Sequence, residues 1–95
     1  MKTGNIYIIT NIRRTVFYTG VTSDLHKRIY EHKHGEGSVF TKKYKLKYLV
    51  YYEEPTTIEQ AIQREKQIKR WHREWKINLI KSVNPEMKDL SEDWY

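Results

Sequence analysis

The strongest constraint on the fold is a pair of strand-like runs near the start of the chain. Residues 5–11 (NIYIITN) and 15–22 (TVFYTGVT) are rich in β-branched and aromatic side chains, which favour strands. Residues 12–14 (IRR) form a short connection of the kind that joins antiparallel strands. The sequence therefore predicts a β-hairpin, and the rest of the chain must pack on the sheet that it begins.

Two further elements follow the hairpin. Residues 24–33 (DLHKRIYEHK) predict a helix, because side chains of the buried type recur at helical spacing and Thr22 or Ser23 can cap it. Residues 46–53 (LKYLVYYE) predict a third strand, which the sequence EPT brings to an end.

The second half of the chain is predicted to be helical. A helix capped near Thr57 ends or kinks near Trp71, and residues 73–82 (REWKINLIKS) continue as another helix that Pro85 stops. The inward-facing residues are expected to be Ile58, Ala61, Ile62 and Ile68, followed by Trp75 and Leu79. The tail, residues 86–95, is expected to pack back across the body as a short helix through Met87, Leu90 and Trp94.

Together these elements predict one α+β domain. Their order, ββαβαα, indicates a three-stranded antiparallel sheet flanked by helices. The chain has 95 residues, the size of a single domain, and thirteen aromatic side chains that can supply its core. Residues 1–95 are therefore expected to form a single domain with a short acidic tail at residues 84–95.

The composition excludes several classes of protein. Without cysteine there can be no disulfide framework and no thiolate zinc site, and the four histidines lack finger-like spacing. Glycine-rich phosphate loops, Gly-x-Ser-x-Gly elbows and His-Glu-x-x-His zinc motifs do not occur in the sequence. No run is apolar enough for a membrane span or a signal peptide, so a soluble cytoplasmic protein is expected.

The charge balance is basic. Lys and Arg outnumber Asp and Glu by 18 to 12, although residues 84–95 carry one basic and four acidic side chains. Cations interleaved with tyrosine and tryptophan suit a polyanionic partner, above all a nucleic acid. On composition alone, a merely solubilising surface is an equal alternative.

Glu65 is the most informative single residue. Helical geometry places it near the middle of the apolar stripe that ends at Ile68, so a carboxylate lies on a face that should be buried. An unpaired buried charge is costly, so Glu65 must meet a cation, a metal ion or a cleft. A salt bridge to a nearby arginine, or a side chain at the edge of the core that snorkels to solvent, is the ordinary interpretation, and a metal-binding carboxylate is the functional one.

Arg28 and His32 lie one turn apart on the helix predicted over residues 24–33, at the margin of its apolar face. Such an arginine can fork onto a phosphate and neutralise charge that builds up during phosphoryl transfer, while the histidine can take or orient a proton. A solvated arginine and a satisfied core histidine are the alternatives.

Tyr7 and Tyr18 lie on the two strands of the predicted hairpin. They share a face only if paired position numbers add up to an odd sum, as when Asn11 faces Arg14 across a two-residue turn. We predict this odd register, or a bulge that restores it. The alternative is that the two rings only pack against each other across the strands and have no catalytic role.

Gly20 falls on the same predicted face as Tyr18. A glycine there leaves a gap in the sheet surface, which a ligand backbone could approach. Together with the odd register, we expect Tyr7, Tyr18, Arg28 and Glu65 to converge on one cleft.

A basic loop is predicted over residues 34–45 (HGEGSVFTKKYK), which show no sustained periodicity and should be exposed and mobile. The side chains expected to follow a nucleic-acid backbone are Lys42, Lys43, Tyr44, Lys45 and Lys47.

Four of these features resemble the GIY-YIG endonuclease family in order and spacing. They are the triplet at residues 5–7 (NIY), the triplet at residues 18–20 (YTG), Arg28 with His32, and Glu65. The likeness covers about residues 4–80 and is closest to the small single-domain bacterial members related to the excision-repair incision nuclease. The fold of that family agrees with the fold predicted above.

The resemblance implies metal-dependent hydrolysis of a DNA phosphodiester with one Mg²⁺ or Mn²⁺ ion, by a structure- or lesion-directed endonuclease of repair or recombination. It implies that Glu65 binds the metal and that Arg28 steadies the phosphate. One of Tyr7 and Tyr18 is then expected to position or deprotonate the attacking water. Because a phenol with its ordinary pKa near 10 is a poor base at neutral pH, His32 is a candidate relay.

The chain departs from the family pattern in both triplets and at two other positions. Val21 stands where some members carry a lysine, so that charge is missing or the lysine's role passes to the loop at Lys42, Lys43 or Tyr44. The nearest match to the family's late asparagine is Asn78.

Two other functions remain open from the sequence. One is a catalytically inactive nucleic-acid-binding module of the same fold, and the other is an adaptor that docks a protein partner through its Trp-rich tail. Cleavage that needs both a metal ion and Glu65 distinguishes the endonuclease from the first; little affinity for DNA would indicate the second.

Overall fold

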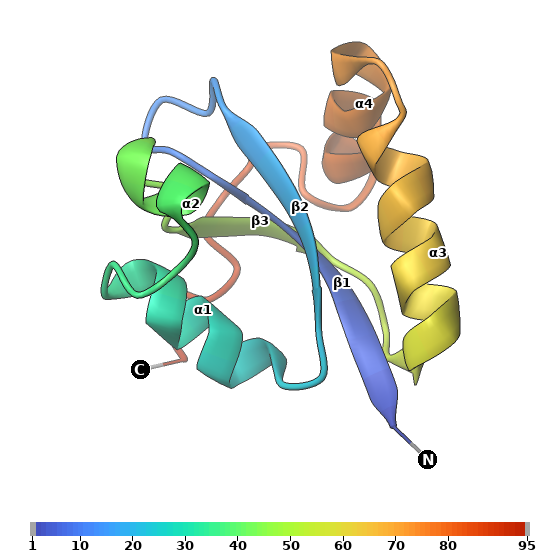
Figure 1. Cartoon of the computed structure of the whole chain (residues 1–95). Coiled ribbons are helices and arrows are strands. Elements are labelled where there is room, and N and C mark those ends of the chain that lie inside the picture. The colour runs from blue at the N-terminus through green and yellow to red at the C-terminus, as the bar shows by residue number, and fades with distance from the viewer. Residues whose placement is uncertain (1, 95) are drawn as a thin grey trace.

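The computed structural model describes residues 2–94 and shows an antiparallel sheet between two pairs of helices (Figure 1). Helices α1 (Leu25–Lys33) and α2 (Val39–Lys43) cover one face of the sheet, and α3 (Ile58–Lys69) and α4 (Arg73–Val83) lie on the other side. The predicted α+β class, with a small antiparallel sheet flanked by helices, is confirmed.

The central strand is β1 (Thr3–Thr10), with β2 (Phe17–Thr22) and β3 (Tyr48–Tyr52) antiparallel on its two sides. The short β4 (Thr56–Thr57), which the sequence did not predict, pairs with the start of β1. A strand in the middle of a two-sided sheet buries both of its faces, and this explains the nearly unbroken apolar run of β1.

Alternate residues of β1 feed two separate apolar clusters. Ile6 and Ile8 pack on the side of α3 and α4, in a cluster that includes Ile68 and Ile80. Tyr7 and Ile9 point to the opposite face, where Ile29 of α1 is fully buried. The strand therefore fixes which of its side chains meet α1, and Tyr7 is one of them.

The hairpin connection is longer than the predicted two-residue turn. Thr10 pairs with Phe17, so residues 11–16 join the strands. The side-chain oxygen of Asn11 organises this loop by accepting hydrogen bonds from the backbone nitrogens of Thr15 and Val16, at 2.8 and 3.1 Å. These side-chain bonds replace the ladder bonds that a tighter turn would have made.

Helix caps agree with the prediction at one helix and differ at another. Thr57 caps α3, accepting a hydrogen bond from the backbone nitrogen of Gln60 at 3.3 Å. The cap of α1 is Asp24 rather than Thr22 or Ser23. Thr22 instead accepts a hydrogen bond from the backbone nitrogen of Asp24 at 3.1 Å, which fixes the chain before the helix starts.

The inward faces of α3 and α4 are narrower than predicted. Ala61 and Ile68 are buried, as expected, but Ile62 is 38% exposed and Trp75 is 56% exposed. Each helix meets the sheet along one stripe, so a residue about 100° away from that stripe faces solvent even when it is apolar. On α4 the fully buried residue is Ile80.

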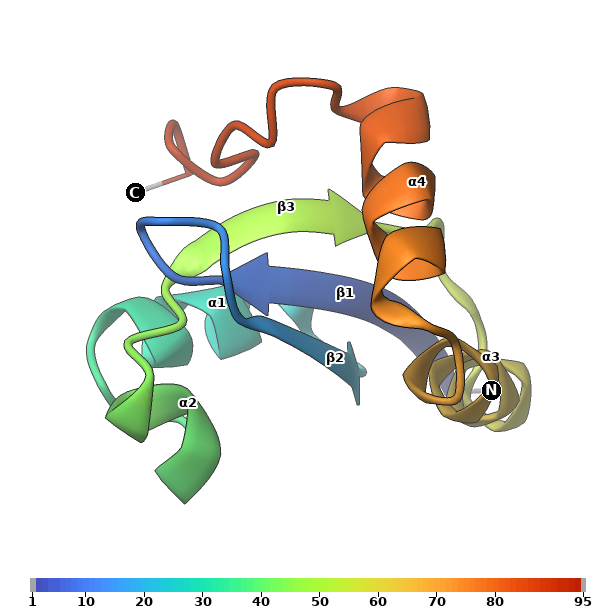
Figure 2. The same cartoon turned by 90° about the horizontal axis from the view of Figure 1, so that it is seen from above.

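The tail is not the predicted short helix but an irregular segment beside β3 (Figure 2). The backbone nitrogen of Leu90 donates to the Leu49 oxygen at 2.7 Å, and the Asn84 side chain donates to the Val50 oxygen at 2.9 Å. The carboxylate of Asp89 accepts from the Leu49 nitrogen at 3.2 Å. Side chains spaced without period make these bonds, so helical periodicity could not reveal them.

The basic loop contains a helix that was not predicted. Ser38 caps α2, and its side-chain oxygen accepts a hydrogen bond from the Thr41 nitrogen at 3.3 Å. Thr41 is buried beneath the loop, whereas Lys42 and Lys43 are exposed. The expectation of a wholly irregular loop was therefore wrong.

Within residues 2–94, no helix has the length and apolar character that a membrane crossing needs.

Candidate active site

The two tyrosines lie on the same face of the sheet. Tyr7 pairs with Gly20 and Ile9 pairs with Tyr18, so the register sum is odd. The two ring centroids are 6.4 Å apart and the rings are tilted by 44°. The predicted parity is confirmed, although the sum is 27 rather than the 25 of the two-residue turn.

Gly20 is filled by Tyr7 rather than open to a ligand. A Cβ atom at Gly20 would lie 2.4 Å from both the hydroxyl oxygen and Cζ of Tyr7. The gap predicted from the sequence is therefore occupied by the Tyr7 side chain. Because position 20 has no side chain, the Tyr7 ring can cross beneath β2 with its hydroxyl close to that strand.

His32 holds the Tyr7 hydroxyl from the side of α1. Its Nε2 atom is 3.1 Å from the hydroxyl oxygen, and the histidine is only 5% exposed. Burial, assisted by the positive charge of Arg28, lowers the pKa of His32 to about 4. At neutral pH the imidazole is therefore uncharged and can share the phenol's proton in a hydrogen bond.

The other ring nitrogen of His32 lies under the chain that leads to α2. A Cβ atom at Gly37 would be 2.4 Å from Nδ1, so the backbone passes very close to the ring there. Nδ1 is buried and has no hydrogen-bond partner among residues 2–94. Burying a polar nitrogen in this way costs stability, and such exceptions are typical of functional sites.

Arg28 approaches Tyr7 from the exposed side of α1. Its Nε atom lies 3.3 Å from Glu31 Oε1, and its side chain is 44% exposed. The pKa of Tyr7 is raised to about 12, mainly by burial and by Tyr18, while the charge and hydrogen bond of Arg28 act in the opposite direction. Arg28 therefore both touches the phenol and keeps a surface open to a ligand.

Glu65 reaches the same place from α3. Its side chain is only 16% exposed, and Oε1 lies 3.5 Å from Nζ of Lys69, one helical turn further on. The charge of Glu65 contributes to the raised pKa of Tyr7, so the carboxylate acts on the phenol electrostatically. The cation that it meets is a lysine, and not the arginine considered from the sequence.

Lys69 is a member of this cluster that the sequence analysis missed. Its Nζ atom lies 5.4 Å from the centroid of the Tyr18 ring, as well as beside Glu65. The spacing of four residues from Glu65 was a visible signal. Such pairs are common on helix surfaces, so the spacing alone could not indicate a place in the site.

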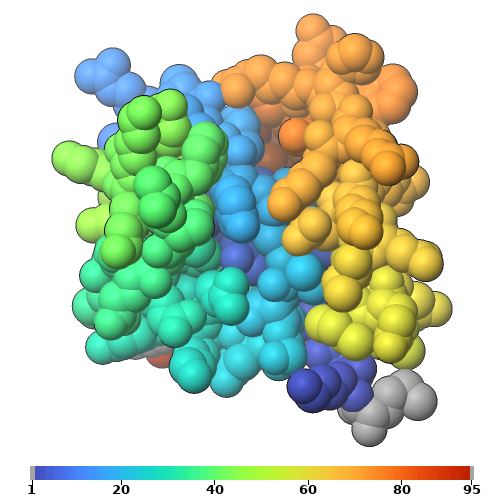
Figure 3. Space-filling view, in the orientation of Figure 1, coloured from blue at the N-terminus to red at the C-terminus, as the bar shows by residue number. Residues whose placement is uncertain are grey.

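The elements that carry these side chains enclose a groove whose floor is β2. In Figure 3 the surface of β2 is visible between the surface of α1 and α2 on one side and that of α3 on the other. β1 and β2 provide the tyrosines, α1 provides Arg28 and His32, and α3 provides the carboxylate. The predicted convergence of these residues is thus found in the structure.

Aromatic side chains connect this groove with the basic loop. The ring of Phe40 lies 6.2 Å from that of Tyr18 and 4.8 Å from that of Tyr44. Both rings on the loop are partly exposed. The four lysines proposed for the nucleic-acid backbone, Lys42, Lys43, Lys45 and Lys47, are exposed along and beyond α2.

Two positions considered from the sequence do not join the cluster. Val21 packs against the apolar cluster of α3 and α4, so its side chain points away from the face that bears the tyrosines. Asn78 is exposed on α4 and lines a shallow hollow with Trp71 and Trp75. The late asparagine that the fold buries is Asn84, which anchors the tail.

A metal ion would find one carboxylate here rather than a ready-made cage. Within the described part of the chain, His, Asp and Glu side chains do not form any group of three that could hold a metal ion. Mg²⁺ commonly binds one or two carboxylates together with water and substrate phosphates. Glu65, half-buried beside the groove, fits that manner of binding.

The fold and the site define a nuclease-family catalytic domain. Residues 3–78 match the family model described as the GIY-YIG catalytic domain, and the chain belongs to this GIY-YIG family. It is 39% identical over 75 residues to a UPF0213 protein of Staphylococcus saprophyticus, a match that covers 79% of this chain and 90% of the relative.

UPF0213 proteins of Staphylococcus aureus, including that of strain N315, are also 39% identical, over 64 residues that make up 67% of this chain and 78% of theirs. No solved structure matches the chain significantly. The family seen from the triplets, Arg28 and Glu65 is confirmed. The names of the relatives state no activity, so the nuclease assignment comes from the family model.

Proposed function

We propose that this protein is a divalent-metal-dependent endonuclease that hydrolyses a phosphodiester bond of DNA. The observation that carries the proposal is the meeting of two phenols, an arginine, a neutral histidine and a half-buried carboxylate in one groove, from four separate elements. Structural packing alone does not need a charged pair and a buried imidazole around the same hydroxyl.

The surface around the groove suits a polyanion. The chain carries a net charge of +6, and the exposed lysines of α2 and the following residues lie beside the aromatic path from Tyr18. Phosphate contacts of this kind bind without regard to sequence. Recognition of a DNA structure or lesion, as in repair or recombination, is therefore the kind of specificity that we propose.

Glu65 would hold Mg²⁺ or Mn²⁺. The ion would supply positive charge that polarises the phosphate and stabilises the leaving oxygen. The chain's own part is to provide a negative oxygen next to the groove and to keep it there, which the packing of α3 against β1 and β2 does.

Arg28 would bind the phosphate on the other side of the groove. Its exposed guanidinium can donate two parallel hydrogen bonds to phosphate oxygens and offset the charge of the transition state. The positive charge of Arg28 acts to lower the pKa of Tyr7, so the guanidinium lies near the phenol oxygen. In this proposal the Tyr7 hydroxyl donates its hydrogen bond to His32 Nε2, which orients the phenol.

The two tyrosines would then have different tasks. Tyr7 is almost completely buried, and with its pKa near 12 it keeps its proton at neutral pH unless further positive charge arrives. Tyr18 is less buried and lies beside Lys69, the ion-pair partner of Glu65. We assign the contact with the attacking water to Tyr18, and the orientation of the groove's hydrogen bonds to Tyr7.

The test is cleavage of labelled duplex, flap, branched and single-stranded DNA with Mg²⁺, with Mn²⁺ and with chelator. Glu65→Gln should keep the fold and abolish nicking, because the amide preserves shape but cannot hold a divalent ion. Glu59→Gln is the matched control, since Glu59 is an exposed carboxylate in the first turn of the same helix. Nicking by Glu65→Gln at the wild-type rate would reject the metal role.

The same panel separates the endonuclease from the inactive binding module. DNA binding by the wild type without any cleavage would support the module, which could use the exposed Phe40 and Tyr44 rings for stacking.

Docking of a protein partner through the tail, and a place in the cytoplasm, stay predictions. Trp94 of that tail packs against His26, with ring centroids 4.0 Å apart.

A further inference from the structure

We propose that Lys69 is a second phosphate-binding cation of this site, placed across the tyrosine pair from Arg28. The inference rests on the proposed function and adds a residue to it. In the free protein, Glu65 holds the Lys69 ammonium; when a divalent ion binds Glu65, the ammonium is released towards the substrate phosphate in the groove.

The position of Lys69 places it beside the tyrosine pair. The residue ends α3, and its Nζ atom lies 3.5 Å from Glu65 Oε1 and 5.4 Å from the centre of the Tyr18 ring. It therefore contacts a side chain from another element on the face that bears both tyrosines. Its side chain is 45% exposed, so the ammonium is accessible to a ligand in the groove.

Arg28 and Lys69 provide positive charge from two sides of the groove. Arg28 comes from α1 and Lys69 from α3, on the two sides of the groove. A phosphodiester gains negative charge on its oxygens as water attacks, and two cations on opposite sides stabilise that charge better than one. The forked guanidinium would orient the phosphate, and the lysine would add a mobile point charge.

A metal ion and the Lys69 ammonium would compete for the Glu65 carboxylate. A carboxylate that already pairs with an ammonium must exchange that partner, at least in part, to bind a metal ion. The divalent ion then repels the ammonium, whose long flexible side chain can turn towards the groove. Lys69 should therefore weaken metal binding in the absence of DNA and yet promote cleavage in its presence.

These opposite effects make the test specific. Lys69→Met keeps the length of the side chain and removes its charge, and Lys66→Met is the control. Lys66 is an exposed lysine on the same helix, but it lines a different hollow with Gln63 and Trp71. Mn²⁺ affinity is measured by titration calorimetry on the DNA-free protein, and cleavage by single-turnover kinetics at saturating DNA.

For Lys69→Met we expect Mn²⁺ to bind about two- to fivefold more tightly, the range of an exposed ion pair. The single-turnover cleavage rate should fall roughly 10- to 100-fold, as when one stabilising donor is removed. Lys69→Arg should restore part of the rate, and Lys66→Met should change neither measurement.

Two results would overturn the proposal. One is a cleavage rate for Lys69→Met within about twofold of the wild type, since a cation on the phosphate must contribute more than that. The other is unchanged Mn²⁺ affinity, which would mean that Lys69 does not compete at Glu65. If the wild type cleaves no DNA, the endonuclease assignment fails, and the calorimetry alone decides whether Lys69 and the metal compete.

Discussion

The ring of Tyr7 lies against the backbone of Gly20, its partner across the β1–β2 ladder, so closely that position 20 has no room for a methyl group. The relationship links the second triplet to the first: glycine in one strand makes the seat for tyrosine in the other. From that seat the hydroxyl meets His32 and Arg28.

Gly20→Ala should therefore destabilise the protein and reduce cleavage together. The added methyl would lie 2.4 Å from the Tyr7 hydroxyl, and overpacking of this kind typically costs about 1–3 kcal/mol. Urea unfolding measures the loss. In a Tyr7→Leu background the shorter side chain should relieve most of it; an equal cost in both backgrounds would contradict the proposed contact.

The buried His32 should make stability fall as the pH decreases from about 6.5 to 4. Its pKa is lowered from 6.5 to about 4, so in this interval the unfolded chain binds the proton that the folded chain excludes. The full shift corresponds to a loss of about 3 kcal/mol by pH 4.

His32→Gln removes this titration while keeping a polar group near Tyr7. The difference in unfolding free energy between wild type and variant should therefore depend on pH in that interval. Other groups titrate as well, and the subtraction removes their contribution. The exposed His34, replaced by Gln, is the control. Parallel curves for wild type and His32→Gln would show that the imidazole is not held neutral.

Arg28→Lys should not rescue the function of Arg28. Lysine keeps the charge but loses the planar fork that matches two phosphate oxygens, so we expect kcat/KM to fall roughly 100-fold, with DNA affinity nearly retained. Because nearly half of the Arg28 side chain is exposed and its one ion pair lies at the surface, the unfolding free energy should hardly change. Lys27→Ala on the same helix controls for the general loss of charge, and cleavage by Arg28→Lys within a few-fold of the wild type would indicate a purely electrostatic role.

The lysines of the basic loop should set the salt dependence of DNA binding. Replacing Lys42, Lys43, Lys45 and Lys47 by Ala should weaken binding to all sequences alike. Each lost phosphate contact should lower the log–log salt slope by about 0.9 on duplex DNA. Fluorescence anisotropy over a range of salt concentrations measures the slope. The same charge change made at Lys66, Lys76, Lys81 and Lys88 should leave it nearly unaltered; equal slopes for the two quadruple variants would place the DNA elsewhere.

The parts of the site that could be predicted follow from regular periods. Strand alternation makes the shared face of Tyr7 and Tyr18 a question of one odd or even sum, and helical geometry puts Glu65 on an inward stripe. Both rules depend only on the backbone geometry of the strand or helix, and not on contacts with other elements. The order of the motifs along the chain then linked these residues with Arg28 through the family resemblance.

The parts that could not be predicted depend on single contacts. Lys69 follows an ordinary helical spacing, and only the packing of α3 against β2 brings it over Tyr18. Asp24 rather than its neighbours caps α1 because Thr22 is engaged with the backbone. The tail follows β3 because of Asn84 and Asp89, and no repeat in the sequence announces such bonds.

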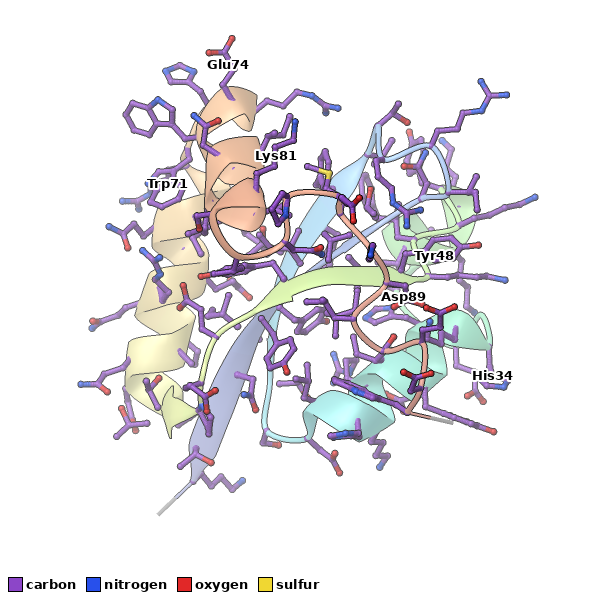
Figure 4. All side chains as sticks on the ribbon, turned by 180° about the vertical axis from the view of Figure 1, so that it is seen from behind. His34, Tyr48, Trp71, Glu74, Lys81 and Asp89 are labelled. Atoms are coloured by element: carbon purple, nitrogen blue, oxygen red, sulfur yellow. The ribbon has the colours of Figure 1, made fainter. Side chains whose placement is uncertain are left out.

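The tail has a consequence for synthesis of the chain. Asp89 joins Lys33 of α1, at 2.6 Å, to Leu49 of β3, and it lies close to Tyr48 where that strand begins (Figure 4). Leu49 and Asp89 are 40 positions apart, so a ribosome completes β3 well before it delivers the residues that cover the outer side of this strand. Until then, backbone groups of β3 are open to pairing with another nascent chain.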